Sequence, residues 1–220
     1  MSLFAASYII NDEKSKFVTT TLARTGTGLK PEVHIGRYKD EKVIISHGNW
    51  KEFTQHFNHF TDFLDGKLKQ HNILLVADHH LTYIYSRCQF GKSYICVSQI
   101  RRNSEEEARC PTTFCFSRSS WGQFAAIQPL IESHLAFIAS AAPVVWSKIV
   151  PALAKAIFRL GGITKDACIN ICSKPGNFTM HEFHADELRA HENDRIVHEI
   201  LMFNNVMIWD RIFESEMAHA

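Results

Sequence analysis

The sequence lacks the motifs of several common classes of protein. Its six cysteines form no CxxC pair and no zinc-finger spacing, which favours reduced thiols in a nuclear or cytoplasmic protein. Gly26 and Gly28 lack the further glycine and the helix start of a phosphate-binding loop. No HExxH motif is present, and no Ser-His-Asp or Cys-His grouping stands out. The chain is therefore predicted to be no enzyme and to use no metal or cofactor.

Strong charge and long apolar runs are also missing. The formal net charge is only +1, and the mild positive excess lies in residues 67–140. The uncharged stretch 135–146 is too short to cross a bilayer and contains Pro143. The first residues lack the basic segment of a signal peptide. These features predict a soluble nuclear or cytoplasmic protein that is not secreted and has no membrane partner.

Thirteen histidines are present, and they raise the question of a metal site. His184, Glu187, His191 and His198 can share one helical stripe, which we interpret as a solvated polar face. Among the cysteines, Cys88, Cys96 and Cys115 fall in strand-like runs and are predicted to be buried as small apolar side chains. No metal ligand is assigned.

One pattern is repeated. Residues 44–53 read IISHGNWKEF, and residues 113–124 read TFCFSRSSWGQF. Each copy has an apolar run, a serine, three further residues, a tryptophan, and a phenylalanine three positions on. The serine can cap a helix, and Trp and Phe at i and i+3 share one helical face, so Trp50 and Trp121 are predicted to be core residues. The recurrence indicates two diverged copies of one unit.

Each junction follows a series of strand-like segments, so an α+β fold of two β-β-β-β-α units is predicted. The proposed domains are residues 1–66, residues 67–140 and a helical extension, 141–220, for packing or oligomerisation. The expected strands span 4–10, 17–24, 32–39, 42–45, 73–77, 81–89, 94–101 and 113–116. The expected helices span 51–64, a segment from 121 onward that Pro129 can kink, 144–160 and 184–214.

This arrangement resembles the single-stranded-DNA-binding domain of the transcriptional coactivator positive cofactor 4, and it is whirly-like. The matching junction residues are Ile45, Ser46, Trp50 and Phe53 in the first copy, and Phe116, Ser117, Trp121 and Phe124 in the second. The family's Pro-Glu pair after the cap is absent from both copies. The resemblance implies antiparallel twisted sheets that form a groove for unpaired strands. Two copies in one chain then imply an intramolecular pseudo-dimer.

Binding of single strands needs cations along the backbone and aromatic faces on which bases stack. Strand alternation puts Tyr83, Tyr85 and Arg87 on one face, near Lys92. An aromatic cross-strand ladder that only stabilises the sheet is the alternative. The other candidate contacts are Lys16, Arg24, Lys30, Arg37, Tyr38, Lys39, Arg101 and Arg102, with Thr19 and Thr21 as neutral phosphate contacts.

The leading hypothesis is a non-enzymatic protein that binds single-stranded DNA with little sequence preference, in replication or as a transcription cofactor. The C-terminal helices are expected to mediate self-association. One alternative is a structural or coat-like assembly protein that keeps the fold without the groove. RNA as the ligand is another alternative, because it uses the same residues.

Overall fold

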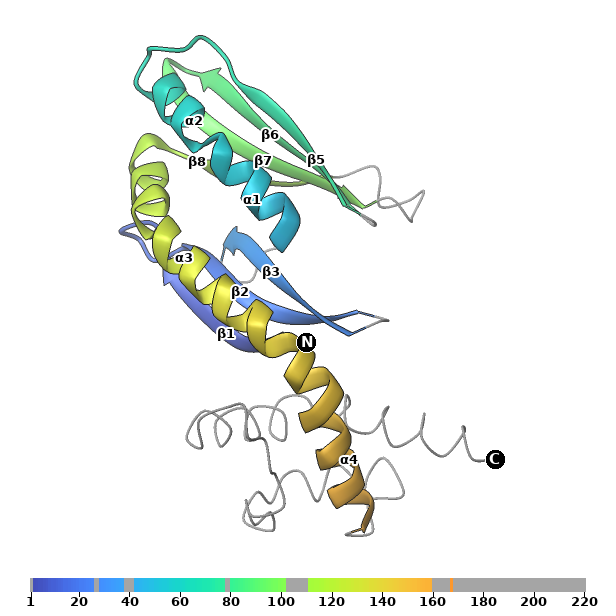
Figure 1. The fold of residues 1–220 in the computed structure, drawn as a ribbon. Helices are drawn as coiled ribbons and strands as arrows, with labels where there is room; N and C mark the ends of the chain where they lie inside the picture. Colours follow the sequence, from blue (N-terminus) through green and yellow to red (C-terminus); the bar gives the residue numbers. More distant parts are fainter. Residues whose placement is uncertain are drawn as a thin grey trace. The chain divides into compact units, whose positions relative to one another are not determined.

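The computed structural model describes residues 2–25, 28–37, 42–77, 80–101 and 111–159, together with residue 167. It contains two four-stranded antiparallel sheets and a set of helices, which is an α+β fold (Figure 1). The strands follow one another in chain order within each sheet. The predicted series of four strands and a helix, repeated once, is therefore confirmed at the level of the elements.

The first sheet has the order β1-β2-β3-β4. Its strands are β1 (Ser2–Ile9), β2 (Lys16–Thr25), β3 (Gly28–Arg37) and β4 (Val43–Ser46). Five consecutive residues of β2 are buried, from Val18 to Leu22, so both faces of this strand are covered. β-branched residues such as Val18 and Thr20 suit that position because they pack well on a pleated surface.

The second sheet has the order β5-β6-β7-β8. Its strands are β5 (Asn72–Val76), β6 (His80–Gln89), β7 (Lys92–Arg101) and β8 (Thr112–Phe116). One face is apolar and buried, with Ile84, Ile95, Val97, Phe114 and Phe116 on it. This face supplies much of the core of the second copy.

Both helix starts have the predicted serine cap. Ser46 precedes α1 (His47–Gln55), and its hydroxyl accepts a hydrogen bond from the Asn49 N–H at 3.3 Å. Ser117 precedes α3 (Arg118–Val144) and accepts equally from the Ser120 N–H at 3.3 Å. The helices therefore begin directly after the serines, three or four residues earlier than predicted, because the cap satisfies the first free N–H groups.

Two helix boundaries were predicted wrongly. The segment expected as one helix is broken at His56 into α1 and α2 (Phe57–Leu64), where the His56 N–H bonds the Phe53 carbonyl three residues back. In contrast, α3 continues through Pro129 and Pro143 into a π-helical turn, η2 (Val145–Ile149), and then α4 (Val150–Arg159). The wider turn lies between Pro143 and Pro151, each of which removes one backbone N–H from the helix. The helix expected at 184–214 lies outside the described residues.

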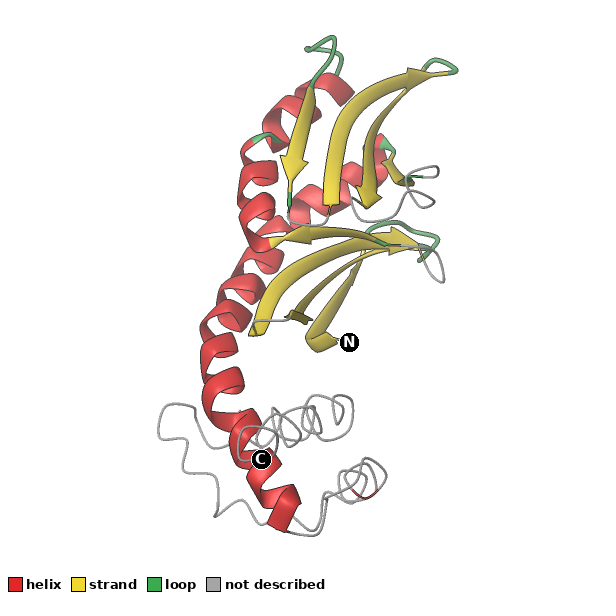
Figure 2. Cartoon of the chain, turned by 90° about the vertical axis from the view of Figure 1, so that its right-hand side faces the viewer, coloured by secondary structure: helices red, strands yellow, loops and turns green. Residues whose placement is uncertain are grey.

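The helices also contact the sheet of the other copy, while Phe124 of α3 stacks on Phe116 of its own sheet. Helices α1 and α2 contact β5 and β7 of the second sheet. The first part of α3 reaches β2 of the first sheet, where His134 Nδ1 and Thr20 Oγ1 are hydrogen-bonded. Figures 1 and 2 show α3 running along the first sheet.

The chain divides into two compact units. One contains Ala5–Thr21 and Pro31–Ala136, and therefore holds both serine–tryptophan junctions. The other contains Met1–Phe4, Leu22–Lys30 and Phe137–Ala220. Within this second unit, the rings of Phe4 and Phe137 meet edge to face at 6.3 Å, and a Cβ added at Gly28 would lie 3.7 Å from the Trp146 indole.

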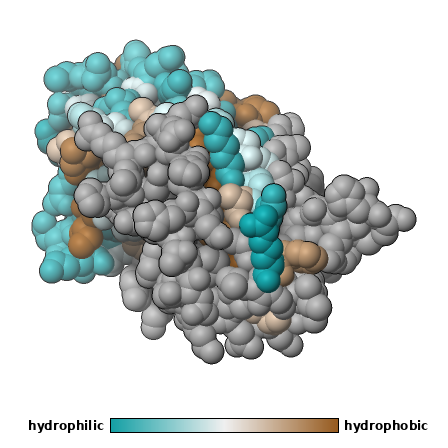
Figure 3. All heavy atoms as spheres, turned by 60° about the horizontal axis from the view of Figure 1, so that its bottom comes forward, coloured by the Kyte–Doolittle hydropathy of each residue, from teal (hydrophilic) through white to brown (hydrophobic). Residues whose placement is uncertain are grey.

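The helical segment 118–159 is long and apolar enough to cross a membrane, judged by length and composition alone. This segment is longer than the uncharged stretch 135–146, from whose length we predicted that no helix crosses a membrane. Buried core helices pass the same test, and part of this segment is buried. Apolar and hydrophilic surfaces alternate on the face drawn in Figure 3. The absence of a membrane partner therefore stays a prediction.

Candidate functional site

The outward face of the second sheet carries the predicted tyrosines. Tyr83 and Tyr85 lie at alternate positions of β6, opposite Ser98 and Cys96 of β7. Arg87 lies opposite Tyr94 in the same register, so a third tyrosine joins this face. The Tyr83 side chain is 40% exposed, and Arg87 is also exposed. The alternation expected from sequence therefore holds in the structure.

Cations from both copies gather beside this face. The Lys16 Nζ donates a hydrogen bond to the Cys115 carbonyl oxygen at 3.0 Å and lies 5.6 Å from the Phe114 ring centroid. Burial lowers the pKa of Lys16, and the Arg37 charge lowers it further. The charges of Arg87, Lys16 and Arg37 all act on the Cys115 thiol. Arg37 is exposed at the end of β3, so its guanidinium is available to an anion.

A pair of thiols lies at the centre of these cations. Cys96 and Cys115 are directly opposite on β7 and β8, and their Sγ atoms are 2.7 Å apart. The hydrogen bond with Cys96 lowers the pKa of Cys115 to about 7, with Arg87, Lys16 and Arg37 acting in the same direction against burial. The hydrogen bond with Cys115 and burial raise the pKa of Cys96. Cys115 is therefore the more acidic of the two thiols.

The phenol of Tyr85 belongs to the same cluster. Burial raises its pKa, and the two neighbouring thiols raise it further. Tyr85 is therefore a neutral phenol at physiological pH. A neutral ring keeps its stacking surface and brings no charge that would repel phosphate.

The other predicted contacts do not all join this cluster. Arg24 and Lys30 belong to the unit that contains α4, and Lys92 is exposed at the β6–β7 hairpin. Arg101 ends β7. Tyr38, Lys39 and Arg102 lie outside the described residues.

Two predictions about small side chains are wrong. Thr19 and Thr21 are buried, and the Thr19 hydroxyl is hydrogen-bonded to Ser7 at 2.8 Å, so neither threonine faces a phosphate. Cys88 is exposed, contrary to expectation, because it lies next to the β6–β7 hairpin rather than over the core. Trp50 and Trp121 are buried, as predicted.

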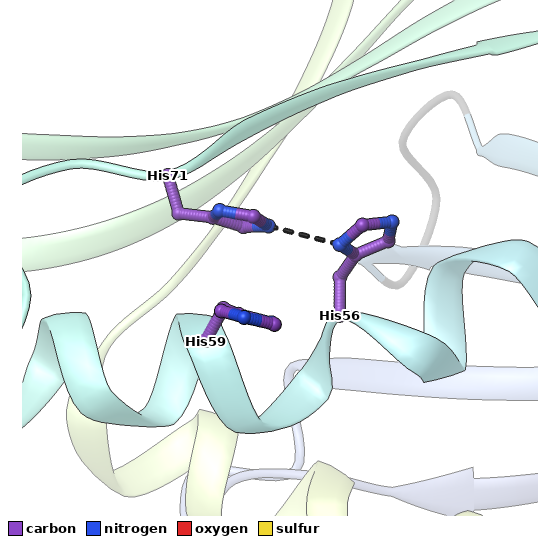
Figure 4. A group of neighbouring side chains, drawn as sticks. All are labelled: His56, His59 and His71. Carbon is purple, nitrogen blue, oxygen red and sulfur yellow. Dashed lines mark hydrogen bonds between the residues drawn. The ribbon is translucent and has the colours of Figure 1, made fainter.

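Sequence reasoning missed a cluster of three imidazoles, His56, His59 and His71 (Figure 4). His56 separates α1 from α2, His59 lies in α2, and His71 precedes β5. The His71 Nε2 and His56 Nδ1 atoms are hydrogen-bonded at 3.0 Å, and the rings of His59 and His71 are stacked at 4.7 Å. The spacing of His56 and His59 at i and i+3 was the available signal. Only the packing of α2 on the sheet brings His71 to them.

Comparison with known proteins adds no relative: no protein-family model matches the chain, and no curated protein matches it. The resemblance to the positive cofactor 4 family therefore stays a prediction. The geometry and chemistry of the described residues carry the functional inference.

Proposed function

We propose that the protein binds single-stranded nucleic acid, with single-stranded DNA as the preferred ligand and little dependence on sequence. The observation that carries this proposal is the outward face of β6 and the start of β7, where Tyr83 and Arg87 are exposed and Tyr85 and Tyr94 are half-buried beside them. Aromatic rings supply stacking surfaces that accept any base, and arginines supply phosphate contacts. A role in replication or as a transcription cofactor follows from this type of binding.

The proposed groove is formed by two copies related as a pseudo-dimer. In a two-fold contact, if residue i of one copy meets residue j of the other, then j of the first meets i of the second. Trp50 and Trp121 are equivalent by the repeat, as are Phe53 and Phe124. The Trp50 and Phe124 rings are 5.8 Å apart, and those of Phe53 and Trp121 are 6.2 Å apart. This reciprocal pair supports the pseudo-dimer.

The strands show a second reciprocal relation, a hydrogen-bonded contact on one side and an electrostatic interaction on the other. Strand pairing makes Ile44 of β4 equivalent to Cys115 of β8, and Arg37 of β3 equivalent to Gln99 of β7. The Gln99 amide bonds the Ile44 N–H at 3.0 Å and the Ile44 carbonyl at 2.6 Å. In the equivalent place, the Arg37 charge acts on Cys115. The first copy therefore contributes a cation at the edge of the second copy's outward face.

The two copies carry different residues at equivalent positions, which favours one asymmetric binding path for the nucleic-acid backbone. Gln99 is a neutral and buried side chain, so its hydrogen bonds to Ile44 hold the two sheets together. Arg37, at the equivalent position of the first copy, is an exposed cation that can bind a phosphate. Because these cations are local, a chain with a net charge of only +1 can still hold a phosphate backbone.

The test is a fluorescence anisotropy titration of the full chain against a labelled single strand of about thirty nucleotides, longer than one small binding fold occupies. We expect salt-sensitive binding that is stronger for the strand than for the matching duplex. Tyr83→Ala and Tyr85→Ala should each weaken binding by about 1–3 kcal/mol, because each removes a stacking surface.

The matched control is Tyr83→Phe, which keeps the ring and removes only the hydroxyl, and it should bind like the wild type. Lys69→Ala controls for the loss of one exposed charge elsewhere. Absence of binding at low salt would reject the proposal. Equal affinity for a single-stranded RNA of the same sequence would remove the preference for DNA.

Exposed apolar side chains favour the alternative of an assembly protein. Leu74 and Val76 of β5 are 45% and 53% exposed, and Leu130 of α3 is 57% exposed. Leu74 and Val76 alternate along β5, which is an edge strand of its sheet, and an exposed apolar edge can pair with another chain. Light scattering over a range of protein concentrations tests this alternative, which predicts large oligomers together with no strand binding.

A further inference from the structure

We propose that His56, His59 and His71 bind one Zn²⁺ ion through their imidazole nitrogens and leave a coordination position open to water. Each residue offers a ligand atom, and these atoms lie within 4.8 Å of one another. This inference does not depend on strand binding, because the cluster lies between α2 and the segment before β5, away from the tyrosine face.

The geometry needs little change to hold an ion. Zn–N bonds of about 2.0–2.1 Å place the nitrogens of a tetrahedral site about 3.4 Å apart. The His56 and His71 nitrogens are already 3.0 Å apart, and the remaining separations, none above 4.8 Å, must close by up to about 1.4 Å. In Figure 4 the stacked rings of His59 and His71 extend in the same direction, toward His56. The His59 and His71 rings are nearly parallel, so the His59 ring must turn about its side-chain torsions to aim its nitrogen at the same point as the other two.

The backbone holds the three residues in place. The His56 N–H bonds the Phe53 carbonyl, and the His56 carbonyl accepts from the Phe60 N–H at 3.1 Å. The His71 N–H donates to the Ser86 hydroxyl at 2.8 Å, and its carbonyl accepts from the Ser86 N–H at 3.0 Å. The Phe60 ring packs edge-on against the His71 ring at 4.8 Å. A site fixed in this way loses little entropy when it binds an ion.

The donor set selects the class of metal. Neutral imidazoles suit zinc, copper and nickel, whereas magnesium and calcium take oxygen ligands. One of the His56 and His71 rings donates the N–H of their hydrogen bond. When the ion binds, this ring changes tautomer, so that its proton lies on the nitrogen that faces away from the metal and the ring stays neutral.

The open position follows from the count of ligands. Among the residues that the structure describes, the group has three members and no carboxylate or thiolate. Zinc bound by three histidines keeps a fourth position for water or an external ligand. His59 is exposed, so this position is accessible from solvent.

The experiment is a competition titration of the full chain, stripped with a chelator, against a colorimetric zinc indicator. We expect one tight equivalent of Zn²⁺. His59→Asn should weaken that site at least about 100-fold, the upper end of what loss of an outer-shell partner costs. His56→Asn and His71→Asn should do the same. Replacing Zn²⁺ by Co²⁺ should give the intense visible bands of a four-coordinate ion in the wild type and not in these three variants.

Two controls exclude other histidines. His47→Asn removes an imidazole from the start of α1, outside the cluster, and should keep the tight site. A double variant, His184→Asn with His191→Asn, should also keep it. Since His59 is exposed, His59→Asn should fold normally, which circular dichroism checks. No tight equivalent in the wild type, or its loss in the double variant but not in His59→Asn, would overturn the proposal.

Discussion

At the scale of single residues, the properties of Cys115 come from three other parts of the chain. Its thiol hydrogen-bonds to Cys96 of the neighbouring strand, and it feels the charges of Arg87 from β6 and of Lys16 and Arg37 from the first copy. A cysteine in a strand-like run is by default a small buried apolar residue. Here the neighbours make it a thiolate near neutral pH, the reactive form.

Alkylation of Cys115 should therefore rise with pH through a midpoint of about 7. Cys96→Ala removes the hydrogen bond that stabilises the thiolate, so the midpoint should move toward the ordinary cysteine value of about 8.5. At pH 7 that shift lowers the alkylation rate about fifteenfold. Peptide mass spectrometry after short exposure to iodoacetamide measures each cysteine separately. An unchanged midpoint in Cys96→Ala would contradict the role of Cys96 in lowering the pKa of Cys115.

At the scale of elements, the edge of the first sheet is closed by a side chain of the second. Gln99 of β7 bonds both backbone groups of Ile44 in β4, and its amide nitrogen also donates to the Thr82 hydroxyl at 2.8 Å. Gln99 is buried, so these are hydrogen bonds that water cannot easily replace. An edge strand with unpaired groups is prone to aggregation, and this contact covers it.

Gln99→Leu should lower the free energy of unfolding by about 2–3 kcal/mol, because it fills the space but leaves Ile44 and Thr82 without partners. Gln99→Ala should cost at least as much, since it also leaves a cavity. Urea denaturation measures both. The control is Gln89→Ala at the exposed end of β6, which should change stability by less than about 0.5 kcal/mol. A leucine variant as stable as the wild type would show that packing, not hydrogen bonding, joins the sheets.

At the scale of the whole molecule, the proposed groove takes cations from both copies. Arg87 comes from the second copy, and Arg37 reaches the same thiol pair from the first. Arg37→Ala and Arg87→Ala should each lower the slope of log affinity against log salt for a single strand by about 0.7, one phosphate contact each. Lys51→Ala, an exposed position of α1, should leave the slope unchanged. If only Arg87→Ala changes the slope, the strand binds one sheet and no shared groove exists.

The sequence by itself determined the local structure. Apolar residues that recur every two positions predicted the eight strands, and those that recur every three to four positions predicted the main helices. The serine–tryptophan repeat predicted that a unit of four strands and a helix occurs twice. Strand alternation also placed Tyr83, Tyr85 and Arg87 on one face. These features depend on neighbours within a few positions, so they can be read from the order of residues. The break at His56 and the continuity of the helix through Pro143 depend on finer geometry and were predicted wrongly.

Only the tertiary structure decided which distant residues meet. The packing of the helices brings Trp50 to Phe124, and the packing of the sheets brings Lys16 of β2 to Cys115 of β8. The packing of α2 brings His59 to His71. Sequence spacing carries no signal for such contacts, because they arise when whole faces are buried against each other rather than from any local preference.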